Sequence, residues 1–176
     1  MPPLTRRFPS RRPRKADPDA ASDPAKLHAA ALTLLARRDY ATGELRQKLE
    51  HNGYDKTLVT GLIEEMAANG YLNDARYAQN YVTWHADRGE GPRRIEADLK
   101  AMSIAPDLIQ AALDAGPDWK ARAKEVRSRR FGPAEPETWP QKAKQGRFLQ
   151  YRGFSSDHIR AALNDDLGPD FEPGSD

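Results

Sequence analysis

The sequence predicts an all-α protein built as three tandem three-helix repeats in an elongated array. The main observation is a period of about 50 residues, at which apolar side chains recur in the same order. Four series hold equivalent positions: Leu49, Leu99 and Leu149; Tyr54, Ile104 and Phe154; Val59, Ile109 and Ile159; Ile63, Leu113 and Leu163. A turn position lies between the first two series and is held by Gly53, Ser103 and Gly153. Such a period indicates one unit copied in tandem, because a single copy cannot bury its apolar face alone.

Composition agrees with a soluble helical protein that has much surface and a modest core. Of the 176 residues, 38% are hydrophobic and 31% are charged. The chain has no cysteine, which excludes disulfides and thiolate chemistry. No apolar run approaches the roughly 18 residues of a membrane span, and the basic N-terminus lacks the apolar core of a signal peptide. We therefore expect a cytoplasmic protein that has no membrane partner.

Helix signals in the first repeat, residues 23–71, come in the order that a three-helix unit needs. Asp23 can cap a helix that has proline at its first position. Thr42 is expected to cap the second helix, and Gly53 to end it in the left-handed conformation that suits glycine. A third apolar stripe ends at Gly70.

The second repeat, residues 72–115, follows the same plan. Asn73 or Asp74 begins its first helix, and Gly89 stops that helix. The two later helices open at prolines, Pro92 and Pro106.

The third repeat, residues 116–167, completes the array. Pro117 starts a helix that Gly132 ends, and a longer loop follows over residues 132–137. Ser155 caps the last helix. The whole pattern predicts nine helices and no strand.

Blocks of like charge lie at the two ends of the chain. Residues 1–22 form a proline-rich basic arm, and residues 168–176 form an acidic tail. Because such blocks bury too little apolar surface to offset their ordering entropy, we predict that both are disordered. The arm is typical of a nucleic-acid contact, and equally of a tail that only aids solubility.

Side chains that could carry catalysis or hold a metal are spread out. The four histidines match no metal-ligand spacing and are interpreted as surface or half-buried groups: His28, His51, His85 and His158. The run over residues 89–92 lacks the third glycine and the preceding strand of a phosphate loop, so a helix stop followed by a helix start explains it better. We expect no catalytic residue, no metal site and no cofactor.

Basic side chains are the remaining candidates for function, and they gather at helix junctions. Basic residues near a helix C-terminus also interact favourably with the helix dipole. This structural reason can explain four of them: Arg37, Arg38, Arg129 and Arg130. Arg93 and Arg94 instead follow a helix start, where positive charge is unfavourable, and this placement indicates a partner. Acidic protein surface and phosphate both remain possible targets, since arginine binds either through two parallel hydrogen bonds.

The aromatic residues Tyr77, Tyr81 and Trp84 recur at helical spacing in the second repeat. This spacing favours packing against neighbouring helices. Stacking on nucleic-acid bases is the alternative, and it would require these rings to be exposed beside arginines.

Three blocks of the sequence resemble the RecX family of recombination regulators. The central block runs over residues 70–78 (GYLNDARYA), 89–95 (GEGPRRI) and 98–99. The first runs over residues 37–40, 44–45 and 48–49, and the last over residues 142–144, 147–149 and 152–155. The resemblance covers about residues 25–165, with all three repeats in order. Two departures lie in the middle repeat: Asn73 stands where an acidic residue is more usual, and His85 where a basic one is.

The resemblance implies a non-enzymatic regulator that acts in homologous recombination, DNA repair and the SOS response. Family members bind the RecA filament on single-stranded DNA and mainly inhibit RecA ATPase, filament growth and strand exchange. When the resemblance is carried over residue by residue, it implies seven partner- or DNA-binding residues: Arg76, Arg88, Arg93, Arg94, Lys144, Arg147 and Arg152. We expect a monomer, and direct contact with single-stranded DNA stays open. The alternatives are a stand-alone DNA-binding repeat protein and a helical scaffold for another protein.

Overall fold

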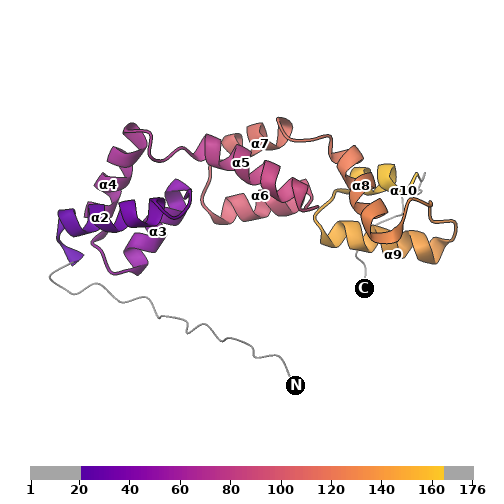
Figure 1. Ribbon diagram of the computed structural model, residues 1–176, viewed down its shortest axis with the longest axis horizontal. Helices are drawn as coiled ribbons and strands as arrows, with labels where there is room; N and C mark the ends of the chain where they lie inside the picture. The colour runs from indigo at the N-terminus through magenta and orange to yellow at the C-terminus, as the bar shows by residue number, and fades with distance from the viewer. Residues whose placement is uncertain (1–20, 165–176) are drawn as a thin grey trace, which may run out of the picture. The chain divides into compact units, whose positions relative to one another are not determined.

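The computed structural model describes residues 21–164, and this range holds nine α-helices and no strand (Figure 1). The all-α class is therefore confirmed. The basic arm, apart from its last two residues, and the acidic tail lie outside the described residues. The helices are α2 (Pro24–Leu35), α3 (Thr42–His51), α4 (Lys56–Ala68), α5 (Asp74–Asp87), α6 (Pro92–Ala101), α7 (Pro106–Asp114), α8 (Trp119–Phe131), α9 (Trp139–Tyr151) and α10 (Ser156–Leu163). None of the described helices has the length and apolar character that would let it cross a membrane.

The chain divides into two compact units, residues 1–72 and 73–176. The first unit contains α2 to α4, whose apolar faces close on a core that includes Leu27, Leu45, Val59 and Met66. The second unit contains two three-helix groups, α5 to α7 and α8 to α10, and the latter group has a core around Leu149, Phe154 and Ile159.

The period of 50 residues corresponds to a repeated helix-ending turn. Gly53, Ser103 and Gly153 all have positive φ, at 97°, 64° and 94°. In each copy the amide of the next residue donates to the carbonyl five residues earlier: Tyr54 to Leu49 (3.3 Å), Ile104 to Leu99 (3.2 Å) and Phe154 to Leu149 (3.1 Å). This bond and a left-handed residue are the marks of a Schellman-type helix end. The leucines that accept these bonds have no exposed surface.

Most predicted helix starts are confirmed, and two are wrong by one or two residues. Asp23 and Ser155 cap α2 and α10 as expected. Thr42 is the first helical residue of α3 rather than its cap. In the third repeat, α8 begins at Trp119 rather than at Pro117, because the Asp118 carboxylate accepts from the amides of residues 120 and 121 at 2.9 and 3.0 Å and so sets the helix start.

The start of α10 depends on a neutral histidine. The Ser155 hydroxyl accepts from the His158 amide at 3.4 Å, and His158 Nδ1 accepts from the Ser155 amide at 3.3 Å. Burial lowers the pKa of His158; the charges of Lys120 and Arg93 act in the same direction, while Asp157 and Asp118 oppose them. Protonation would remove the acceptor, since both nitrogens of the imidazolium are donors.

We expect the stability that His158 confers to be lost in acid. Its pKa in the folded chain lies below the ordinary value of about 6.5, so the unfolded chain takes up the proton first. The contribution is therefore complete above about pH 6.5 and declines below it. In urea unfolding at pH 7.5 and 5.5, the midpoint should fall further for the native chain than for His158→Gln, which keeps an acceptor but does not titrate. An equal fall in both proteins would contradict this assignment.

Candidate binding surface

The second and third repeats meet at a junction made largely of main chain. We use this name for the contact between residues 88–94, which end α5 and begin α6, and residues 152–154, the turn before α10. The Gly91 amide donates to the Arg152 carbonyl at 2.7 Å, and the Arg93 amide donates to the Gly153 carbonyl at 3.0 Å. A Cβ added at Gly91 would lie 2.4 Å from the Gly153 carbonyl carbon, so only glycine permits this approach.

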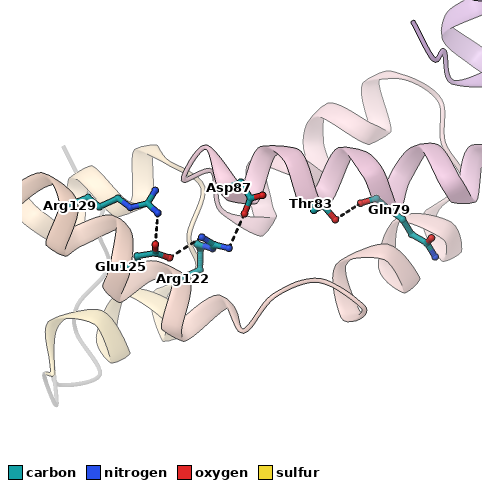
Figure 2. Close-up of polar contacts among 6 residues, drawn as sticks. All are labelled: Gln79, Thr83, Asp87, Arg122, Glu125 and Arg129. Carbon is teal, nitrogen blue, oxygen red and sulfur yellow. Dashed lines mark hydrogen bonds and ion pairs between the residues drawn. The ribbon is translucent and has the colours of Figure 1, made fainter.

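Charged side chains join the same two repeats beside the junction (Figure 2). Arg122 of α8 reaches Asp87 at the end of α5 at 3.0 Å, and it also contacts Glu125 on its own helix at 2.9 Å. Arg129, further along α8, pairs with the same Glu125 carboxylate. The Arg122 side chain is only 20% exposed, whereas its partner Asp87 is 64% exposed, so water still reaches this ion pair from the carboxylate side.

A cavity of about 180 Å³ lies next to the junction. We call it the arginine pocket, and it is lined by Arg88, Gly89, Val126, Arg129, Arg130, Phe148 and Arg152. Arg88 Cζ lies 4.4 Å from the centre of the Trp84 ring, and Arg152 Cζ lies 5.4 Å from that of Phe148. Arg152 Nη1 also donates to the Arg88 carbonyl at 3.4 Å. Two helices of the third repeat and the end of α5 thus bring four arginine side chains around one hollow.

Of the seven residues predicted to bind a partner, the structure brings Arg88 and Arg152 together in this pocket. Arg93 and Arg94 lie at the junction. The Arg94 guanidinium is 3.5 Å from Glu90, and this ion pair gives it a structural reason to stand near a helix start. Arg93 is exposed, and its amide is one of the two that hold the junction.

The other three predicted residues lie elsewhere. Lys144 and Arg147 are exposed on α9 and share one side of that helix with Tyr151, because the spacings are three and four residues. Tyr151 is 81% exposed. Arg76 is exposed in the first turn of α5, about 18 Å along the helix from Arg88 at 1.5 Å per residue. Basic side chains therefore occupy at least three separate places.

Arg127 belongs to the core rather than to a binding surface, although its sequence neighbours on α8 include the exposed bases Lys124, Arg129 and Arg130. It is 5% exposed. Its guanidinium donates to the carbonyls of Ala134 (2.8 Å) and Pro133 (3.3 Å) and to the side chain of Gln145 (3.4 Å). Arg127 therefore holds the loop between α8 and α9 onto the third repeat.

Helical spacing favours packing for the aromatic residues of α5. This interpretation is wrong for Trp84. This residue is 57% exposed beside Arg88. The core face of α5 is instead a stripe of smaller residues, Ala78, Val82 and Ala86, each at most 1% exposed. Trp84 thus meets the condition set for the alternative, an exposed ring beside an arginine.

Among the described residues, one group of three side chains could hold a metal ion: His85, Glu90 and Asp98, whose ligand atoms lie within 4.8 Å of one another. The search for metal-ligand spacing in the sequence does not find this group, because its members come from two helices and the loop between them. His85 Nδ1 lies 2.8 Å from Glu90, and the Tyr81 hydroxyl donates to Asp98 at 3.3 Å. Burial and the charge of Asp98 raise the pKa of Tyr81 well above its usual value. Arg94 already places positive charge against Glu90, so internal contacts account for the group.

Three-helix groups that share one repeated turn define a helical-repeat protein. Models of the first, second and third three-helix domains of RecX match residues 28–66, 73–113 and 118–163. The regulatory protein RecX of Halorhodospira halophila is 41% identical over 146 residues, which are 80% of this chain and 91% of that protein. The chain belongs to the RecX family.

Other relatives agree with this assignment. The regulatory protein RecX of Vibrio vulnificus is 39% identical over 137 residues, covering 77% of this chain and 90% of that protein. The crystal structure of RecX from Lactobacillus salivarius superposes with a TM-score of 0.70 at 21% identity, covering 80% of this chain and 94% of that one. The fold is therefore shared by proteins whose sequences have diverged widely.

Proposed function

We propose that this protein is a non-enzymatic regulator that binds the RecA filament on single-stranded DNA. It acts there as a monomer in the cytoplasm and mainly inhibits RecA ATPase, filament growth and strand exchange during recombination, DNA repair and the SOS response. The observation that carries the proposal is the match of all three repeats, in order, to the three domains of RecX.

The distribution of charge supports a polymeric partner. Exposed basic side chains lie on α5, at the junction, around the arginine pocket and on α9. Several modest contacts to neighbouring subunits of a filament add up, because each bound contact raises the effective concentration of the next. We propose Arg76, Arg88, Arg93, Arg94, Lys144, Arg147 and Arg152 as the residues that meet the filament.

The test is a titration of the full chain into RecA on single-stranded DNA. We expect ATP hydrolysis and strand exchange to fall at amounts of protein below those of RecA, because one bound copy would restrain several subunits. Unchanged rates across the titration would overturn the proposal and leave the two alternatives, a stand-alone DNA-binding repeat protein and a helical scaffold for another protein.

Reversal of two charges on α9 tests the contact surface. The double variant Lys144→Glu/Arg147→Glu should inhibit strand exchange about tenfold less well, since both side chains are exposed and like charge then faces an anionic filament. The matched control is Lys120→Glu/Lys124→Glu, which reverses two exposed charges on α8. Equal loss in both variants would show that only total charge matters. Arg94 is a poorer choice because its reversal would set two acids against each other at Glu90.

A further inference from the structure

The arginine pocket carries positive charge that the protein itself leaves unneutralised. Arg129 shares the Glu125 carboxylate with Arg122. Within residues 21–164, Arg88, Arg130 and Arg152 form no ion pair, and each guanidinium lies instead over an aromatic ring, at 4.4, 6.0 and 5.4 Å from the ring centre. Guanidinium groups without an acid partner around one hollow fit an anion that can accept several hydrogen bonds.

The shape of the pocket fits a small anionic group. Its wall includes the buried side chain of Val126 and the half-buried ring of Phe148. Gly89 lets the end of α5 lie close to Val126 of α8, since a Cβ at this position would lie 3.1 Å from the Val126 side chain. At about 180 Å³ the cavity has room for one phosphodiester group and its sugar carbons.

An aromatic platform lies at the edge of the same pocket. Trp84 is 57% exposed, and Arg88, which lines the cavity, lies over its ring. A base can stack on such a ring only when it is free of its duplex neighbours, which is the state of bases in a single strand. A phosphate site with an exposed indole beside it therefore fits single-stranded nucleic acid better than a duplex or an acidic peptide.

We propose that the arginine pocket binds the backbone of single-stranded DNA directly, with one phosphodiester among Arg88, Arg130 and Arg152 and an adjacent base on Trp84. This deepens the proposed function and rests on it for the choice of DNA as the nucleic acid. The contact itself needs no RecA, so it can be measured on the full chain alone.

The charge arm of the experiment uses the fluorescence anisotropy of a labelled oligo(dT) strand titrated with the full chain in rising salt. Removing two charges that contact the one phosphate, in Arg88→Gln/Arg130→Gln, should weaken binding about tenfold and lower the slope of log K against log salt by about 0.7, the value for one phosphate that is no longer neutralised. The matched control, Lys120→Gln/Lys124→Gln, removes two exposed charges from other positions on α8 and should bind like the native chain. Equal weakening in the two variants would overturn the proposal.

The aromatic arm tests Trp84. Trp84→Ala should weaken binding to oligo(dT) by roughly 5- to 150-fold, which corresponds to a stacking contribution of about 1–3 kcal/mol, and Trp84→Phe should restore most of it. In a Trp139→Phe background, oligo(dT) should quench the emission of the exposed Trp84. Two results together would overturn the stacked base: emission of the Trp139→Phe protein that does not change on addition of oligo(dT), and an affinity of Trp84→Ala equal to that of the native chain.

Three further outcomes separate this proposal from the alternatives. Competition by poly(glutamate) as strong as that by oligo(dT) of equal charge would show a site for acidic protein and overturn the DNA contact. Strand exchange with RecA is measured on the same variants. Inhibition of RecA by a native chain that binds no oligo(dT) would overturn the pocket but keep the regulator. Binding of oligo(dT) through the pocket without any effect on RecA would support the pocket and overturn the regulator.

Discussion

Replacing Leu99 with alanine is expected to destabilise the second unit by about 2–5 kcal/mol, the usual cost of removing a buried leucine side chain. Leu99 has no exposed surface, and its carbonyl accepts from the Ile104 amide at the end of α6. The cavity left behind would lie under the repeated turn itself. Because natural domains are stable by only about 5–15 kcal/mol, this loss is a large fraction of the total. Urea unfolding followed by helical circular dichroism measures it.

The control for this prediction is Leu32→Ala. Leu32 also lies in a helix, but it is 38% exposed, so the same truncation should cost clearly less stability than it does at Leu99. If the two variants unfold at the same urea concentration, our division between core and surface leucines is wrong.

Replacing Gly91 with alanine should weaken the junction between the second and third repeats. The new methyl group would lie 2.4 Å from main-chain atoms of residues 153 and 154, which cannot move aside as a flexible side chain can. Overpacking of this kind costs about 1–3 kcal/mol. In hydrogen exchange, the Arg93 amide, which donates across the junction, should lose protection. The Ile159 amide, bonded within the third repeat, should keep more of its protection.

Gly61→Ala is the matched control for this change. Gly61 lies inside α4, and a Cβ there would meet nothing within 4 Å. The same substitution should therefore stabilise the first unit by about 0.5–1 kcal/mol, because alanine is the better helix former. Opposite signs at the two glycines are the expected result, and a gain in stability at both would contradict the tight approach at Gly91.

The repeat, the helices and their turns can be predicted because they depend on local residues. Leu99, for example, is buried in α6 by the same rule that buries its counterparts 50 residues away. The position of Ser103 in the period is enough to predict a turn there, and this residue adopts φ 64° although it is not glycine. Helix starts are harder to predict, since Asp118 caps α8 although Pro117 before it is the stronger start signal in the sequence.

The arrangement of the candidate site is harder to predict because it depends on contacts between repeats. The glycine at position 91 has the sequence context of a helix stop, and only the approach of residue 153 explains why no side chain fits there. Arg127 has the sequence context of another surface base, because the carbonyls that bind it belong to a loop without a sequence signal. The helical spacing of Trp84 favours the core, while the small residues of α5 make the actual packed face.

Glycines and peptide groups make the junction between the second and third repeats, and this has a consequence for how related sequences can diverge. Substitution of Arg88, Arg130 or Arg152 changes the side chains around the arginine pocket but leaves the two main-chain hydrogen bonds of the junction in place. Related proteins can therefore change the ligand preference of this pocket without changing how the two repeats pack. The peptide groups keep the two repeats aligned while the side chains beside them evolve.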